Sequence, residues 1–140
     1  MAADRLTAEE CRFKVSLTLP EREVHENVAY IGKIPYAEVF EYYQGSTLVF
    51  PSYIESFGYP LVEARAVGTL ILASDCPFSH ELLDGYENAY FFDPFSPEQL
   101  ASLMKQILSG KIVKKDVKRE DVEVRDNWVG VIAEIKSTSR

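Results

Sequence analysis

The chain has 140 residues, of which 46% are hydrophobic and 26% charged, and its formal net charge is −7 at pH 7. This length fits one domain, and the composition can bury a real core, which excludes an intrinsically disordered chain. The acidic balance argues against nonspecific nucleic-acid binding, which needs a basic face. It leaves a small anionic ligand open, because a helix N-terminus can bind one without net positive charge.

Cysteine content and hydropathy favour a reducing compartment. Cys11 and Cys76 are too few for a disulfide scaffold and lack the spacing of a metal site. The start, MAADRLTAEE, has no apolar signal core, and no apolar run reaches the length of a membrane span. We therefore expect a cytoplasmic protein without a bound metal ion.

Short β-rich segments recur along the chain. Residues 13–19 alternate apolar and polar side chains, as a half-buried strand does. Residues 47–50 are apolar without alternation, which is typical of a strand covered on both faces. The expected strands are residues 13–19, 28–31, 47–50, 70–73 and 89–92.

Helical segments lie between these strands. Apolar residues at helical spacing predict a helix that opens at Pro35 and stops at Gly45, and its aromatic stripe is expected to be core. A capping box at residues 96–99 predicts another helix, with Gly110 as its C-cap. The remaining expected helices are one after Pro60 and a short one through residues 80–83, closed by Gly85.

The two ends of the chain carry weaker signals. Residues 7–10 match a capping box for a very short helix, and Asp126 is a candidate cap for a last one. Residues 111–125 are charged without a strong period, which favours a solvated linker. We therefore expect a lead-in at 1–12, one domain at 13–110, and a linker with a C-terminal helix at 111–140.

The alternation of strands and helices predicts an α/β fold, with a parallel sheet covered by helices on both faces. Ligands of such sheets bind outside the carboxyl ends of the strands. Three loops leave these ends, after residues 31, 50 and 73. Gly32, Glu55 and Asp75 are therefore expected to share one rim.

The stretch from residue 50 to residue 68, FPSYIESFGYPLVEARAVG, is the strongest candidate site. Glu55 lies in its loop, and Glu63 lies in the first turns of the helix expected to start at Pro60. The free amides and the dipole of that helix form an anion seat, and Gly58 would let a ligand approach the backbone. An ordinary strand–loop–helix joint with two solvated acids explains the same stretch.

Several spaced blocks resemble a known family. FPSYIESFGYPLVEARAVGTLILASD is similar to the nucleotide-sugar-binding half of retaining glycosyltransferases of the GT-B fold, the glycosyltransferase group 1 family. Glu55 and Glu63 match its E-x7-E motif, and residues 28–32 resemble its V-x-x-x-G strand. Residues 88–94 and 96–100 resemble its closing strand and helix, so the similarity covers residues 13–110 in a Rossmann-like three-layer arrangement.

The resemblance implies roles for individual residues. Glu55 would be catalytic, contacting the donor sugar and supporting positive charge at its anomeric carbon. Glu63 would hold the ribose hydroxyls, since a carboxylate is a bidentate acceptor. Asp75 would either touch the ligand or cap the next helix, and Glu81 resembles a glutamate common in the family. The other donor-binding positions would be Ser56, Phe57, Gly58 and Tyr59 at the sugar and diphosphate, and Gly32, Lys33 and Ile34 near the nucleobase.

The resemblance also has gaps. The family's enzymes have two Rossmann-like domains, and this chain has no room for the acceptor-binding one. The opening β-α unit of the donor domain should precede residue 13 and normally carries an Arg/Lys pair that neutralises the diphosphate. Lys33 and Arg65 lie in the wrong blocks to replace it. We expect an incomplete domain that is inactive alone and that dimerises or aggregates through an exposed sheet edge.

The resemblance implies a parent enzyme that transfers a hexosyl group from a UDP- or GDP-linked sugar to a glycan or lipid-linked acceptor. It would retain the anomeric configuration, need no metal or other cofactor, and act in the cytoplasm or at the inner membrane face. A non-catalytic interaction module and a nucleotide-sugar epimerase fragment are the alternatives.

Two histidines and a cysteine carry smaller signals. His80 is either a general base or a surface residue at a helix start, and His25 is expected to be solvated. Cys76 is expected to be a packing residue rather than a nucleophile.

Overall fold

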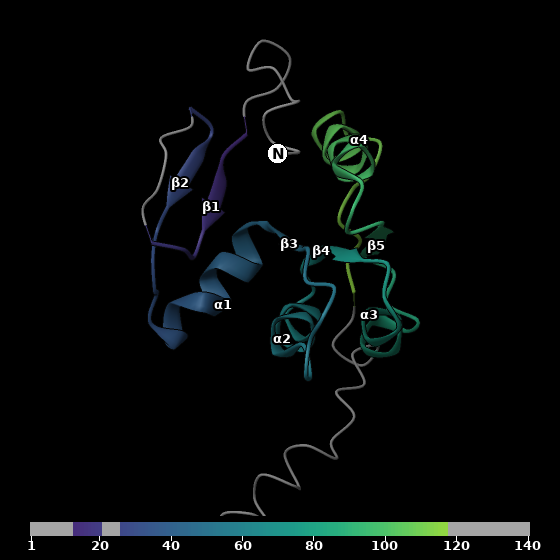
Figure 1. Cartoon of the computed structure of the whole chain (residues 1–140), viewed down its shortest axis with the longest axis horizontal. Helices are drawn as coiled ribbons and strands as arrows, with labels where there is room; N and C mark the ends of the chain where they lie inside the picture. The colour runs from purple at the N-terminus through teal and green to yellow at the C-terminus, as the bar shows by residue number, and fades with distance from the viewer. Residues whose placement is uncertain (1–12, 21–25, 118–140) are drawn as a thin grey trace, which may run out of the picture.

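The computed structural model describes residues 13–20 and 26–117 (Figure 1). The expectations for the capping box at residues 7–10, for Cys11, for His25 and for the helix after Asp126 lie outside the described residues.

The N-terminal strands form a small sheet of their own. Strand β1 (Val15–Leu17) runs parallel to β2 (Val28–Tyr30), with Val15 opposite Val28 and Leu17 opposite Tyr30. The backbone bond from Ile31 N to Leu17 O, 2.8 Å long, extends the pairing beyond β2. Both strands are shorter than the sequence predicts.

A second parallel sheet has the order β3-β4-β5. It consists of β3 (Thr47–Phe50), β4 (Leu70–Ser74) and β5 (Ala89–Phe92). All five residues of the central strand β4 are buried, because it has a neighbour on each edge and helices on both faces. The bounds of β3 and β5 match those expected from their apolar, turn-bounded segments.

Helices cover both faces of this second sheet (Figure 1). Helices α2 (Tyr59–Ala66) and α3 (Pro77–Leu83) lie on one face, and α4 (Pro97–Leu108) lies on the other. Helix α1 (Tyr36–Gly45) connects β2 to β3 and packs beside α2. The core gathers under α2, where Leu61 and Ala64 are fully buried against Ile71 and Ala73.

The α/β architecture with parallel strands confirms the expected partial Rossmann-like fold, and the strands divide between two parallel sheets. Among the described residues, β1 pairs only with β2, and β3 pairs only with β4. In Figure 1 strands β1 and β2 are seen from the side, at nearly their full length, whereas β3, β4 and β5 point towards or away from the viewer and look shortened. Within the described residues each sheet therefore has two edge strands, β1 and β2 in the first and β3 and β5 in the second, whose outer sides carry no ladder.

Helix ends follow the sequence signals with small differences. The Ser96 side chain accepts from Gln99 N at 3.3 Å, as a capping box requires. The Gln99 side chain does not return to the cap, because its Oε1 accepts from Asp93 N at 2.9 Å instead. Gly45 is the last residue of α1 rather than its stop, and Pro60 is the second residue of α2 rather than its first.

A buried asparagine fastens the segment after α4 to the domain. Asn88 is fully buried, its Nδ2 donates to Lys115 O at 3.0 Å, and its Oδ1 accepts from Lys115 N at 2.8 Å. Ile112 is also buried, and Val117 packs on the core. The first residues of the expected linker are therefore anchored to the domain.

We predict that Asn88→Ala lowers the free energy of unfolding by about 2 kcal/mol, because it leaves buried backbone groups without partners. Urea unfolding followed by circular dichroism measures this. Lys115→Ala is the matched control, since it removes only the exposed 3.0 Å ion pair with Glu87 and keeps the backbone bonds to Asn88. Equal losses in the two variants would contradict the anchoring role of Asn88.

Candidate functional site

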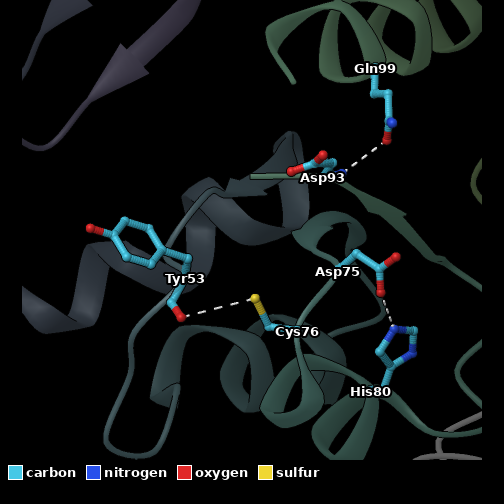
Figure 2. A network of polar contacts seen from close by, with 6 residues as sticks. All are labelled: Tyr53, Asp75, Cys76, His80, Asp93 and Gln99. Carbon is cyan, nitrogen blue, oxygen red and sulfur yellow. Dashed lines mark hydrogen bonds and ion pairs between the residues drawn. The ribbon is translucent and has the colours of Figure 1, made fainter. Parts of the chain in front are cut away.

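The carboxyl ends of β3, β4 and β5 lie at one edge of the second sheet, because the three strands are parallel and in register. The loops that leave them contact one another (Figure 2). Cys76 Sγ, after β4, lies 4.0 Å from Tyr53 O, after β3. Asp93, after β5, is held by the Gln99 side chain from the start of α4. We call this edge, made of the loops after Phe50, Ser74 and Phe92, the rim.

Glu55 lies on the rim, half-buried in the loop after β3. Its Oε1 accepts from Ser56 N at 3.0 Å and lies 3.5 Å from Ser56 Oγ. Among the described residues these bonds end on Oε1, so Oε2 keeps its capacity to accept from a ligand hydroxyl.

Two features of the loop before α2 favour glycine at position 58. It is the N-cap of α2 with φ of 82°, a left-handed conformation that glycine adopts without a steric penalty. A Cβ there would also lie 2.9 Å from Leu82 Cδ1 and 3.6 Å from Glu55 Cγ. The backbone of this loop therefore lies close to α3, and an added Cβ would require the end of the Leu82 side chain to shift.

We predict that Gly58→Ala destabilises the fold by about 1–3 kcal/mol, from left-handed strain of about 1–2 kcal/mol and the contact with Leu82. Thermal denaturation at several urea concentrations measures this. The matched control is Gly85→Ala, which has φ of 67° but nothing within 4 Å of the added Cβ, so it feels only the strain. If the two variants lost the same stability, the close approach to Leu82 would carry no energetic weight.

Glu63 lies on α2 and accepts two hydrogen bonds from tyrosines of α1. Tyr36 donates to Oε1 at 2.9 Å, and Tyr43 donates to Oε2 at 3.2 Å. The hydrogen bond with Glu63 raises the pKa of Tyr36, whereas burial and then the Glu63 charge raise the pKa of Tyr43. Both phenols stay protonated at neutral pH and act as donors.

Tyr36 is the first residue of α1 and directly follows the loop at residues 32–35. Its bond to Glu63 therefore brings the loop with Gly32, Lys33 and Ile34 towards α2, although this loop follows β2 of the other sheet. The expectation that the aromatic stripe of α1 is core is correct for Tyr43 but wrong for Tyr36, whose side chain is 65% exposed.

Asp75 pairs with a histidine on the rim (Figure 2). His80 Nε2 lies 2.6 Å from Asp75 Oδ1, and the imidazole stacks on Phe91 with centroids 4.0 Å apart. Cys76, not Asp75, is the N-cap of α3, and no side chain caps that helix. His80 lies in the last turn of α3 rather than at its start, and it is exposed, as is the neighbouring Glu81.

Acidic side chains dominate the rim. Glu55, Asp75 and Asp93 lie in its three loops, and His80 pairs with one of them. Arg65 Nη1 donates to Leu82 O at 2.7 Å, and its guanidinium lies 5.6 Å from the Tyr86 ring, between α2 and α3. Within residues 13–20 and 26–117, no group of three or more His, Cys, Asp or Glu side chains could hold a metal ion.

An apolar hollow of about 460 Å³ adjoins the rim, lined by Phe50, Pro51, Ser52, Tyr53 and Ile54. Tyr53 contacts Phe95 from the loop after β5, with centroids 5.2 Å apart and both rings largely exposed. Sequence patterns did not single out Tyr53 and Phe95 as neighbours of the candidate site, and they assigned Tyr36 to the core. The position of Tyr53 and Phe95 in loops at the carboxyl ends of strands was the signal that could have found them.

The fold and the rim define a Rossmann-like α/β unit with two glutamates bracketing a glycine-containing loop. Residues 9–123 match the family described as glycosyl transferases group 1, so the chain belongs to this family. This confirms the resemblance drawn from the residues. Over 86 residues the chain is 31% identical to the O-antigen chain mannosyltransferase RfbU of Salmonella typhimurium. The match covers 61% of this chain and 24% of that relative, so the chain spans about a quarter of its length.

None of the helices in the described part of the chain is both long and apolar enough to cross a membrane.

Proposed function

We propose that this chain is the donor-binding part of a retaining glycosyltransferase and that a nucleoside diphosphate sugar binds along the rim and the Tyr36 end of α1. The observation that carries the proposal is the position of the two glutamates of the E-x7-E motif. Glu55 lies in the rim loop, and Glu63 is hydrogen-bonded to the residue that follows the 32–35 loop. Sugar, ribose and base can therefore be held in that order.

In this proposal each part of the donor has its own contacts. Glu55 meets the sugar hydroxyls and supports positive charge at the anomeric carbon, while the backbone at Ser56, Phe57, Gly58 and Tyr59 meets the sugar and diphosphate. Glu63 accepts from the ribose, and Lys33 and Ile34 border the base with Gly32. Asp75, in the rim loop after β4, and Glu81, on the helix α3 that follows it, complete the proposed donor set.

The proposed parent reaction is transfer of a hexosyl group from a UDP- or GDP-linked sugar to a glycan or lipid-linked acceptor, at the inner membrane face. The family implies a nucleotide-sugar donor in general. RfbU is described as a mannosyltransferase, so a mannosyl group is the first candidate. We also propose that this chain alone transfers nothing, since Arg65 is bonded to Leu82 O and, among residues 13–20 and 26–117, no Lys or Arg lies in the rim loops to meet the leaving diphosphate.

We predict that one of UDP, GDP and ADP binds and that Glu63→Ala weakens it by about 1–3 kcal/mol, the cost of a lost buried hydrogen-bond partner. Isothermal titration calorimetry measures both. Glu41→Ala, an exposed acid on α1, is the control and should leave binding unchanged. The same samples should show no turnover of the matching nucleotide sugar. Absence of binding by all three nucleotides would count against the donor site.

A second candidate function, a non-catalytic interaction module, is favoured by the open strand edges. Within the described residues the outer sides of β1, β2, β3 and β5 carry no ladder, and unpaired edges invite pairing with another chain. We predict concentration-dependent self-association, measured by sedimentation velocity from micromolar to near-millimolar protein. Lysines in place of Leu48 and Phe50 would disrupt the fold, because both side chains pack on the core. The variant that tests pairing at the edge of β3 is therefore Thr47→Pro, at the start of the strand. A clean monomer at all concentrations would contradict the prediction.

A further inference from the structure

Two hydroxyl groups donate to the Glu63 carboxylate, one to each of its oxygens. Tyr36 and Tyr43 are seven residues apart on α1, two helical turns, so their side chains lie on one face. Each phenol donates to a different oxygen, at 2.9 and 3.2 Å. A carboxylate that binds two neighbouring hydroxyls of a ribose would accept in the same pattern.

The two phenols differ in how firmly they are held. Tyr43 is 9% exposed, its ring meets Phe40 edge-on, and its carbonyl accepts from Thr69 Oγ1 at 2.8 Å. Tyr36 begins the helix, is largely exposed, and has one ring contact, with Phe40 at 5.4 Å. Tyr43 is therefore held in place by the core, whereas the Tyr36 side chain can rotate away from Glu63 without disturbing the core.

The charge on Glu63 makes both bonds stronger than neutral ones. Hydrogen bonds to an ionised acceptor are about twice as strong as neutral ones. Because the carboxylate is half-buried, an oxygen left without a donor would be costly. The structure places one phenol donor on each oxygen, and a ribose hydroxyl that takes the place of Tyr36 on Oε1 keeps that oxygen paired.

We propose, on the basis of the donor site proposed above, that Tyr43 is a positioning residue for Glu63 and that Tyr36 is a displaceable stand-in for a ribose hydroxyl. Tyr43 holds Oε2 and fixes the plane of the carboxylate. Tyr36 occupies Oε1 until the nucleotide arrives, and then its side chain rotates away while the adjoining 32–35 loop stays beside the base. Donor binding is thereby coupled to the start of α1.

The two tyrosines should respond to the same substitution with opposite signs. Tyr36→Phe removes the competing hydroxyl but keeps the ring, so nucleotide affinity should rise about threefold to tenfold, as one net hydrogen bond implies. Tyr43→Phe removes the group that orients Glu63, so affinity should fall by a similar factor. The matched control is Tyr42→Phe, a partly exposed tyrosine of the same helix whose hydroxyl makes no bond to Glu63.

The experiment is calorimetric titration of the full chain and the three variants with UDP, GDP and ADP and with the 2′-deoxy form of whichever binds. The gain in Tyr36→Phe should shrink for the 2′-deoxy nucleotide, because the incoming hydroxyl is then missing. A structural defect in Tyr43→Phe would weaken both forms equally, whereas loss of positioning should weaken the ribose form more. Tyr36→Phe alters an exposed side chain, so it tests the stand-in role even if Tyr43→Phe unfolds.

The possible failures separate the two proposals. Unchanged or reduced affinity in Tyr36→Phe, while Glu63→Ala still weakens binding, would overturn the stand-in role and leave the donor site standing. Equal effects of Tyr43→Phe on ribose and 2′-deoxy nucleotides would overturn the positioning role. Absence of nucleotide binding by the natural chain and by Tyr36→Phe would overturn the donor site itself, and this inference with it.

Discussion

The pairing of β4 on both of its edges is the constraint on which the candidate site depends. Its five residues are buried and hydrogen-bonded to β3 on one side and β5 on the other, in parallel register. Parallel strands end at the same edge, so the loops with Glu55, Asp75 and Asp93 must meet there. The sequence of β4, LILAS, suits this position because a strand covered on both faces needs apolar residues without alternation. A polar residue in its middle would disturb all three rim loops together.

The two glutamates of the site are restrained by different physical means. Glu55 is held by its own loop, through Ser56 N, and the loop in turn depends on a left-handed glycine that only just clears Leu82. Glu63 is held from outside, by two phenols of a neighbouring helix. The first restraint is local and survives any change in α1. The second depends on how α1 packs against α2, so the geometry at Glu63 can change while that at Glu55 stays fixed.

Local sequence patterns predicted the local structure well, but they did not predict contacts between residues that are far apart in the sequence. The bounds of β3 and β5 follow from short apolar segments between turn residues, and Ser96 caps α4 as its capping box indicates. The division into two sheets did not follow, because periodicity identifies a strand but not its neighbour. The exposure of Tyr36 was not predicted for a related reason. Helical spacing identifies which face of a helix is apolar, but not how far along that face the core extends. Asn88 lies in the block that resembles the family's closing strand, but that block gave no sign that Asn88 fastens a segment 27 residues later in the chain.

The Tyr–Glu–Tyr arrangement has a consequence for what could drive donor binding. If each Glu63 oxygen already has a phenol donor, a ribose hydroxyl that displaces Tyr36 exchanges one hydrogen bond for another of the same kind. Such an exchange contributes less net free energy than a hydroxyl that takes an oxygen covered only by water. Glu63 would then select for the presence of a hydroxyl, because a ligand without one leaves a half-buried carboxylate oxygen unpaired once Tyr36 has moved. On this proposal most of the affinity must come from the base, the diphosphate and the sugar. The acidic side chains of the rim repel the diphosphate, so this part of the donor most needs a cation beside it.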